Sequence, residues 1–308
     1  MEEKGQYLIG MDGGGTKTSV VVKWADGWEE EFLSGPFNIN GQEKEETART
    51  LEEIAASLKK RGCAISLCQG IGVGCAGISN PESESFLHKK LSELGFSCRL
   101  DFFGDQESAL ASAFPDGCGM ILIAGTGSVC YGKSESGKTV RAGGWGHLID
   151  DGGSGYAIAR DLFRAVARAE DGRGEITVMK DLLWDALEID GIRGMIRYLY
   201  APGRSKKEIA SFAKLVAKAA ALGDREALKI EARAADQLCE LASCVIFRME
   251  GERRLAFSGS VLQNNGRIRA QLADKIRRLH PEVEVCKTEK SAAQGALALL
   301  ERKDEGKR

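Results

Sequence analysis

The sequence lacks a long apolar run, and its charges almost balance, with 43 basic and 45 acidic residues among 308. Without an apolar run long enough to cross a bilayer, a membrane-spanning protein is not expected. The first six residues also lack the apolar stretch of a signal peptide. A net charge of −2 gives no reason to expect nucleic acid or a membrane surface as a partner. We therefore expect a cytoplasmic protein that acts on a small molecule, and we leave a homodimer open.

Histidine is scarce, with three residues, and no two of the nine cysteines stand at CxxC spacing. The closest cysteine pairs, Cys63/Cys68 and Cys239/Cys244, suit buried positions. We expect all nine cysteines to be free thiols in a reducing cytosol. His147 has no partner at a metal-ligand spacing, which favours a structural role for it.

The chain repeats a pattern of strand, glycine-rich turn and strand. Apolar residues 7–11 run into the turn 12–19, and apolar residues 120–124 run into the turn 125–128. A second strand follows each turn. The same element order at two places in the chain indicates an internal duplication.

Two later pairs of segments extend this duplication. A short strand and a small-residue helix occur at 99–114 and again at 283–297. Apolar strands that end in small residues occur at 70–77 and 255–262. Alternation of apolar and amphipathic segments predicts an α/β fold for each half.

We therefore predict a first domain over residues 1–116 and a second over residues 117–308. The second is longer because helical segments follow its hairpin; they are expected within 154–169, 179–187 and 206–249. We leave open that the last helix packs back on the first domain.

The two glycine-rich turns are candidate phosphate-binding loops, because backbone N–H groups can approach an anion closely where no Cβ intervenes. A lone glycine hairpin is more often just a tight turn, but two related loops could clamp one polyphosphate between the domains. Hydroxyls of Thr16, Thr18 and Ser128 add donors, and Asp12 could hold Mg²⁺ directly or through water. Neither loop is a P-loop or a Rossmann motif. The expected phosphate-binding residues are Gly13, Gly14, Gly15, Thr16, Lys17, Gly125, Thr126 and Gly127.

The Asp-Gly-Gly-Gly-Thr motif at 12–16 and the Gly-Thr-Gly-Ser motif at 125–128 resemble the two phosphate motifs of the sugar kinase/Hsp70/actin superfamily. Within it, the chain is similar to the N-acetylglucosamine kinases and the related BadF/BadG/BcrA/BcrD ATPases. Further motifs carry the resemblance at 35–38, 74–77, 143–147, 151–156, 171–174 and 259–262. It implies a duplicated actin-like ATPase (ribonuclease H-like) fold, two domains with a central cleft, and ATP with Mg²⁺ as cofactors.

Asp105 is the candidate general base, because a sugar hydroxyl needs a carboxylate to orient it and accept its proton. The competing interpretation is a helix N-cap, which aspartate favours; the resemblance decides for the base. The resemblance also implies sugar contacts at Asn38, Asp105, Ser128, Gly144, Trp145, Gly146 and Asp151. A tryptophan between glycines can offer its face to a sugar ring. Gly152 and Val129 depart from the family pattern, which usually has glutamate and, in animal N-acetylglucosamine kinases, asparagine there.

Residues 259–264 resemble the adenosine motif, although a plain strand-to-helix turn would look similar. The resemblance implies adenosine contacts at Ala210, Gly259, Ser260 and Asn264.

The leading hypothesis is phosphoryl transfer from ATP to an amino sugar, N-acetylglucosamine or glucosamine, with the 6-OH as the expected acceptor and Asp105 as base. One alternative is another hexose or a murein sugar such as N-acetylmuramic acid. A second is a BadF-type ATPase that activates a partner enzyme through a [4Fe–4S] cluster with cysteine ligands. Such activators carry a cysteine just ahead of the second loop; here apolar residues 121–124 fill that stretch, and Cys118 and Cys130 lie on either side of it. A third is a nucleotide-binding regulator without catalysis, which would have no need of Asp105.

Overall fold

The computed structural model describes residues 5–15, 17–37, 44–75, 78, 80–249, 251–288 and 290–305. The chain forms two compact units. Unit 1 combines Met1–Cys118 with Lys287–Arg308, and unit 2 is Gly119–Cys286. The first division falls two residues after the boundary expected at 116, and the chain returns to unit 1 for its last helix.

Unit 1 is built on a five-stranded sheet in the order β3-β2-β1-β4-β5. β1 pairs antiparallel with β2 and parallel with β4, which in turn is parallel to β5. The strands are β1 (Tyr7–Gly13), β2 (Thr18–Trp24), β3 (Glu29–Ser34), β4 (Cys68–Cys75) and β5 (Arg99–Gly104). The helices are α1 (Lys44–Lys60), the short η1 (Ile65–Leu67), α2 (Pro81–Glu93), α3 (Asp105–Ala113) and α12 (Ala292–Glu305).

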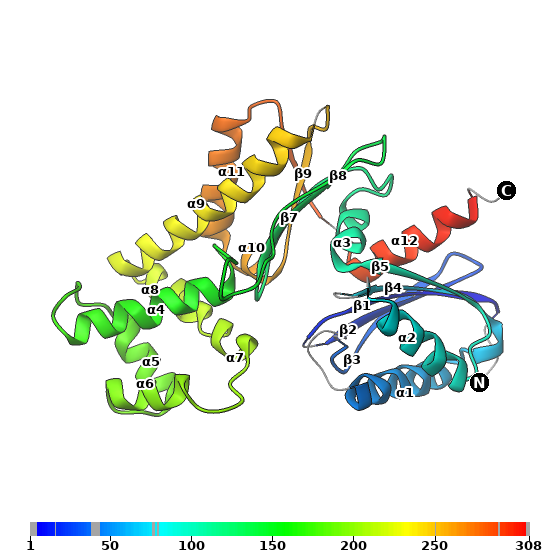
Figure 1. The fold of residues 1–308 in the computed structure, drawn as a ribbon, viewed down its shortest axis with the longest axis horizontal. Helices are drawn as coiled ribbons and strands as arrows, with labels where there is room; N and C mark the ends of the chain where they lie inside the picture. The colour runs from blue at the N-terminus through cyan, green and yellow to red at the C-terminus, as the bar shows by residue number, and fades with distance from the viewer. Residues whose placement is uncertain are drawn as a thin grey trace. The chain divides into compact units, whose positions relative to one another are not determined.

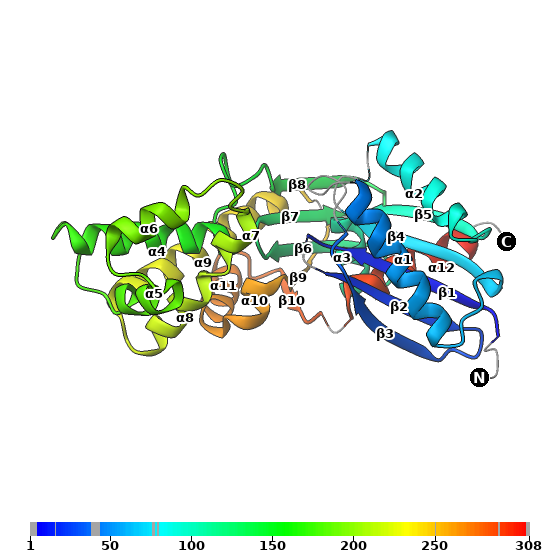
Figure 2. The ribbon, with the colours of Figure 1, turned by 90° about the horizontal axis from the view of Figure 1, so that it is seen from below.

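Alternating side chains give this sheet two buried faces. On one face Ile9 and Met11 of β1 form a core with Leu51 of α1 and Leu87 of α2. Figure 1 shows α1 and α2 on this side of the sheet and α12 on the other, and Figure 2 shows α1 and α2 side by side. The opposite face is packed by α12, whose leucines contact Val21.

Two glycines allow α12 to approach the sheet closely. A Cβ on Gly10 would lie 2.2 Å from the carbonyl oxygen of Ala293, and one on Gly72 would lie 2.5 Å from that of Ala296. Both contacts are with backbone, which cannot rotate away as a side chain can. Glycine at these positions of β1 and β4 is therefore a packing requirement.

Unit 2 repeats the topology of unit 1, with a five-stranded sheet in the order β10-β9-β6-β7-β8. The β6–β7 hairpin occupies the place of β1–β2, and β9 pairs parallel with β6 as β4 does with β1. The strands are β6 (Gly119–Ala124), β7 (Ser128–Lys133), β8 (Thr139–Gly143), β9 (Arg254–Ser258) and β10 (Glu284–Cys286). The predicted duplication of the α/β fold is confirmed.

The helices of unit 2 share one core with its sheet. α9 packs on this sheet with Leu238 and Ala242 against Leu122 and Cys130, and α11 lies beside α9 (Figure 1). The helices are α4 (Gly155–Glu170), α5 (Met179–Leu187), α6 (Ile192–Leu199), α7 (Lys206–Ala210), α8 (Ala213–Ala221), α9 (Arg225–Arg248), α10 (Ser260–Asn264) and α11 (Gly266–Leu279). Helices α4 to α9 follow β8, where a helical insertion was expected. Among them, α6 lies outside the ranges in which helices were expected.

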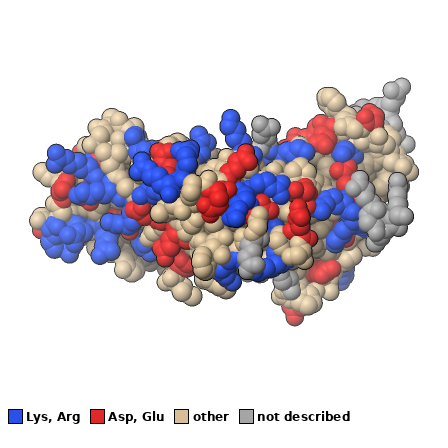
Figure 3. All heavy atoms as spheres, turned by 90° about the horizontal axis from the view of Figure 1, so that it is seen from above, with Lys and Arg blue, Asp and Glu red and all other residues tan. Residues whose placement is uncertain are grey.

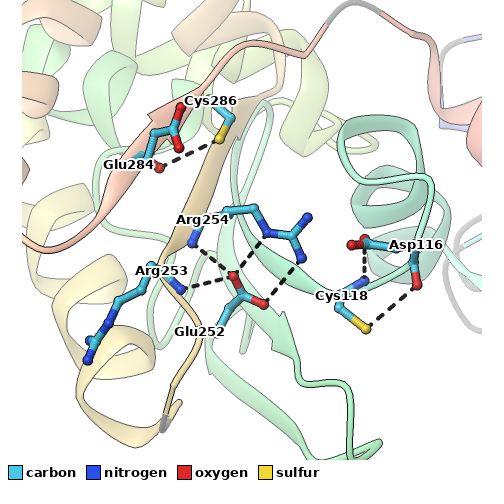
Figure 4. A network of polar contacts seen from close by, with 7 residues as sticks. All are labelled: Asp116, Cys118, Glu252, Arg253, Arg254, Glu284 and Cys286. Atoms are coloured by element: carbon cyan, nitrogen blue, oxygen red, sulfur yellow. Dashed lines mark hydrogen bonds and ion pairs between the residues drawn. The ribbon is translucent and has the colours of Figure 1, made fainter.

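A carboxylate fixes the start of β9 (Figure 4). Oε1 of Glu252 accepts hydrogen bonds from the backbone N–H groups of Arg253 and Arg254, both at 2.9 Å, and from Nε of Arg254 at 3.2 Å. The β9–β10 pair begins here, because N–H of Glu284 donates to the carbonyl of Arg253 at 2.7 Å.

Charges of both signs are interspersed on the face drawn in Figure 3, in keeping with the net charge of −2. Within the described residues, no helix is both long enough and apolar enough to span a membrane.

Candidate active site

The first glycine turn closes the β1–β2 hairpin at the carboxyl end of β1. Gly13 pairs with Thr18, and the N–H of Gly14 donates to the carbonyl of Lys17 at 3.2 Å. Gly13 has no room for a side chain, since a Cβ there would lie 2.1 Å from the ring of Phe37. The expected ligands Thr16 and Asn38 lie outside the described residues.

Thr18 differs from its predicted role as a phosphate donor. Its side chain is fully buried, and its hydroxyl donates to the carbonyl of Gly35 at 2.7 Å. The hydroxyl therefore ties the hairpin to the chain that follows β3. Gly15 and Lys17 are exposed at the turn, where an anion could reach them.

Asp12 and Asp105 lie at the same edge of the unit 1 sheet. Asp12 pairs with Gly74 of β4, and Gly74 pairs with Phe103 of β5, two residues before Asp105. With strands about 4.8 Å apart, the backbones of Asp12 and Phe103 are separated by two strand spacings, or about 10 Å, and Asp105 lies two residues further along. Since β1, β4 and β5 run parallel, their carboxyl ends bring these residues together.

The pKa of Asp12 is affected by this proximity. Burial raises the pKa of Asp12 from 3.8 to about 6, and the negative charges of Asp105 and Glu31 add to the rise, while Lys17 opposes it. Cys75 belongs to β4, the strand between β1 and β5, and burial together with the charges of Asp105 and Asp12 raises the pKa of its thiol to about 12. A concentration of negative charge at one sheet edge suits a cation.

The donor set fits Mg²⁺, which prefers carboxylate oxygens and usually takes one or two of them together with water and substrate phosphates. Asp12 is a partly buried carboxylate whose charged form is disfavoured by its surroundings, so a divalent cation would stabilise it. Within the described residues, no cluster of three or more His, Cys, Asp or Glu side chains could hold a metal by itself. A metal here would therefore depend on oxygens from water and the nucleotide.

Asp105 is not the cap of its helix. The N-cap of α3 is Gly104, and its N–H is satisfied by Glu107, whose Oε2 accepts at 3.2 Å. Asp105 is the first residue of the helix, and its Oδ1 accepts from the N–H of Gln106 at 3.0 Å. The capping interpretation is therefore wrong, and a different residue supplies that stabilisation.

The second glycine turn is held by the start of α4. N–H groups of Gly155 and Tyr156 donate to the carbonyls of Gly125 and Thr126, at 2.8 and 3.3 Å. In the described part of the chain, the N–H groups of Thr126 and Gly127 at the tip of this turn make no hydrogen bond. Backbone donors of this kind are what an anion such as a phosphate can bind.

Asp151 is one of the residues of unit 2 that were expected to contact the sugar. Its side chain is buried, its backbone has a positive φ of 65°, and its Oδ1 accepts from the N–H of Ser128 at 3.1 Å. Its Oδ2 accepts from Nζ of Lys206 at 2.7 Å. Gly127 must stay small here, because a Cβ would lie 2.9 Å from Oδ1 of Asp151.

Ser128 is itself almost fully buried, and its hydroxyl donates to the carbonyl of Gly152 at 2.7 Å. N–H of Gly153 donates to Oε1 of Gln237 on α9 at 2.9 Å. These bonds fix the turn around Asp151 against the second loop. The Ser128 hydroxyl hydrogen is therefore used within the protein. Only the lone pairs of its oxygen remain, and they could accept a hydrogen bond from a sugar.

The loop after β8 presents its tryptophan to solvent. Gly144 and Gly146 both have positive φ, and Trp145 between them is 64% exposed. Arg141 holds the loop by donating to the carbonyl of Gly144 at 2.6 Å, and its guanidinium lies over the Trp145 ring at 4.8 Å. The opposite ring face could stack on a sugar. His147 packs edge-on against Tyr156 at 4.6 Å, a structural contact.

The expected adenosine residues lie around the second loop. Gly259 has a φ of 90° and precedes α10, and a Cβ on it would lie 2.4 Å from the carbonyl oxygen of Ala124. A Cβ on Gly125 would lie 3.9 Å from the hydroxyl of Ser260. Ala210 approaches from α7, with its carbonyl 3.4 Å from the Cβ position of Gly155. Asn264 is exposed at the end of α10.

Sequence reasoning missed Lys206, Gln237 and Arg141, which hold the site residues of unit 2 in place. No local motif points to Lys206, because its partner Asp151 is 55 positions away in the sequence. Only its place next to Ser205, the N-cap of α7, could be foreseen from the pattern of a capping box.

Comparison with known proteins identifies relatives over almost the whole chain. The chain is 33% identical over 299 residues to the N-acetylmuramic acid/N-acetylglucosamine kinase of Clostridium acetobutylicum, covering 96% of this chain and 98% of that protein. It is 29% identical over 314 residues to the N-acetyl-D-glucosamine kinase of Dictyostelium discoideum, covering 96% and 97%. These relatives agree with the resemblance that the motifs indicate.

The fold is similar to that of a proposed N-acetylglucosamine kinase from Chromobacterium violaceum, with a TM-score of 0.77 and 24% identity over 96% of this chain and 99% of that one. The expected duplicated, actin-like α/β fold is confirmed. A sequence model of the BadF/BadG/BcrA/BcrD ATPase family matches residues 9–300. The chain therefore belongs to the BadF/BadG/BcrA/BcrD ATPase family.

Proposed function

We propose that the protein is an ATP-dependent kinase of N-acetylglucosamine that transfers the γ-phosphoryl group to the 6-OH. The names of both curated relatives and membership of an ATPase family support this proposal. The observation that carries it is the pair of aspartates at the carboxyl edge of the unit 1 sheet, where Asp105 perturbs the pKa of Asp12. Two acidic groups with different surroundings can divide the tasks of base and metal ligand.

Asp105 is the proposed base. Its carboxylate would orient the sugar hydroxyl and accept its proton as the phosphoryl group transfers. It stands at the first position of α3, where its Oδ1 accepts from the N–H of Gln106 at 3.0 Å. Ser128, Gly144, Trp145, Gly146 and Asp151 would contact the sugar.

Asp12 would hold Mg²⁺, which would neutralise charge on the phosphates. The N–H groups of Thr126 and Gly127, together with the first glycine turn and Lys17, would bind the polyphosphate of ATP. The open N–H groups of the second loop support this assignment. Gly259, Ser260, Ala210 and Asn264 would contact the adenosine.

The electron-transfer alternative has less support. Cys130 is fully buried in the core of unit 2, so its thiol could not ligate a cluster shared between two chains. Cys118 lies in a turn where its N–H donates to Asp116 at 3.1 Å (Figure 4). A sugar kinase needs neither thiol.

A coupled assay of ADP release with N-acetylglucosamine, glucosamine, N-acetylmuramic acid and glucose tests the proposal. We expect turnover with N-acetylglucosamine, and a 6-phosphate as product by ³¹P NMR. The 6-deoxy analogue is the matched control, and it should bind without being phosphorylated. ATP hydrolysis at the same rate with and without every sugar would refute the kinase assignment.

A further inference from the structure

A cavity of about 350 Å³ in unit 2 is lined by three cationic side chains, Arg160, Arg204 and Lys206. It lies between the loop after β8, α4, and the segment that leads into α7. None of the described residues that line it is acidic. Tyr156 and Tyr200 add hydroxyl groups to the wall. A cavity with this lining suits a small anion.

Each cation is steadied by a carboxylate that does not line the cavity. Nζ of Lys206 lies 2.7 Å from Asp151, an NH1 donor of Arg204 lies 2.5 Å from Glu208, and Arg160 lies 3.7 Å from Asp161 on the same helix. Arg204 also donates from Nε to the carbonyl of Tyr198 at 3.2 Å. An ammonium has three N–H donors and a guanidinium has five, so these contacts leave donors for a ligand. The three side chains keep 33%, 23% and 53% of their surface exposed.

The cavity adjoins the residues proposed to bind the sugar. Lys206 contributes to its wall and is bonded to Asp151, the buried carboxylate beside the second loop. His147 also lines it and directly follows the Trp145–Gly146 pair. A substituent on a sugar held by Asp151 and Trp145 is therefore within reach of the cavity, in the same unit.

We propose that this cavity binds the carboxylate of an acidic substituent on the amino sugar. The lactyl ether of N-acetylmuramic acid, the sugar in the name of the Clostridium relative, is such a substituent. Its carboxylate would accept from Arg160, Arg204 and Lys206, and its methyl group would contact Phe163. The inference rests on the proposed kinase function and adds the residues that recognise acidic amino sugars.

Arg160 is the residue to change, because it lines the cavity without contacting Asp151. The rate constant kcat/KM is measured for N-acetylmuramic acid, for its methyl ester, which lacks the charge, and for N-acetylglucosamine. In Arg160→Gln the preference for the acid over the ester should fall roughly ten- to hundredfold, the range for a hydrogen bond to a charged group. Arg160→Lys should retain much of the preference.

Arg164→Gln is the matched control, since Arg164 is an exposed arginine one turn further along α4 that does not line the cavity. Its preference for the acid should equal that of the wild type. An unchanged acid-to-ester ratio in Arg160→Gln overturns the inference, and so does a wild-type enzyme that turns over N-acetylglucosamine but not N-acetylmuramic acid.

Free D-lactate distinguishes a substituent from an independent anion. If millimolar D-lactate inhibits N-acetylglucosamine turnover in the wild type and not in Arg160→Gln, while the acid-to-ester ratio stays the same, the cavity binds free anions and the inference is wrong. If no sugar is phosphorylated at all, the proposed function falls first and the inference falls with it.

Discussion

Replacement of Asp12 by asparagine should stabilise the metal-free protein at neutral pH. Asp12 is a partly buried carboxylate whose pKa is raised from 3.8 to about 6 by burial and by the charges of Asp105 and Glu31. The raised pKa means that the folded protein binds the Asp12 proton more tightly than the unfolded chain does. Ionisation of Asp12 at neutral pH therefore opposes folding, and an amide of the same shape removes that cost.

The sign and size follow from the two pKa values. Well below pH 3.8 Asp12 is protonated in both states and contributes nothing; between 3.8 and about 6 the cost grows, and above about 6 it becomes constant. At 1.36 kcal/mol for each pKa unit, the ceiling is about 3 kcal/mol. With some relaxation of the site, we expect Asp12→Asn to raise the melting temperature by a few degrees at pH 8.

The assay is thermal unfolding in EDTA from pH 4 to pH 8. Glu52→Gln is the control, since Glu52 is an exposed carboxylate in the middle of α1, and its melting temperature should follow the wild type throughout. Added Mg·ATP should stabilise the wild type more than Asp12→Asn, because at a given ligand concentration the tighter binder gains more stability of the folded state. A lower melting temperature of Asp12→Asn at pH 8, or a difference that does not change with pH, would refute the reasoning.

Two further predictions concern Asp105 and Gly10. Asp105→Asn should lower kcat roughly 10²- to 10⁴-fold with little change in ATP affinity, whereas Glu107→Gln, the same acid-to-amide change two residues along α3, should stay within a few-fold of wild type; equal kcat values for the two variants would remove Asp105 as base. Gly10→Ala should lower the free energy of unfolding by about 3 kcal/mol in urea titrations, because its Cβ would lie 2.2 Å from the carbonyl of Ala293. Gly266→Ala, where nothing lies within 4 Å of the new Cβ, is the control, and equal losses in both variants would contradict the packing argument.

The duplicated core of the fold could be predicted because its central strands are buried on both faces. β1 and β6 lie in the middle of their sheets, so they appear in the sequence as short apolar runs followed by glycine turns. The edge strand β3 was missed for the opposite reason. Its sequence begins with three glutamates, and only Phe32 is fully buried. A strand with one covered position gives too little alternation to recognise.

The place of the last helix is a matter of tertiary packing. α12 looks like an ordinary small-residue helix in the sequence, and its neighbours along the chain, β9 and β10, belong to unit 2. What brings it to unit 1 is a set of small residues on two strands far away in sequence, including Gly10 and Gly72. Glycines inside strands signal close approach by some backbone, but they do not say which one.

In the candidate site, too, positions set by nearby sequence could be predicted, and contacts with distant segments could not. Asp12 could be placed at the end of an apolar strand, and Asp105 was assigned as base by the family resemblance. Parallel strands bring their carboxyl ends to one edge, so the two residues share that edge. The hydroxyls of Thr18 and Ser128 could not be assigned, because a hydroxyl near a glycine loop serves a ligand or the backbone equally well by its sequence. Here both donate to carbonyl groups of later segments, those of Gly35 and Gly152. The proposed phosphate contacts at these loops therefore rest on backbone N–H groups, which the glycine-rich pattern indicates only in general and does not assign to single residues.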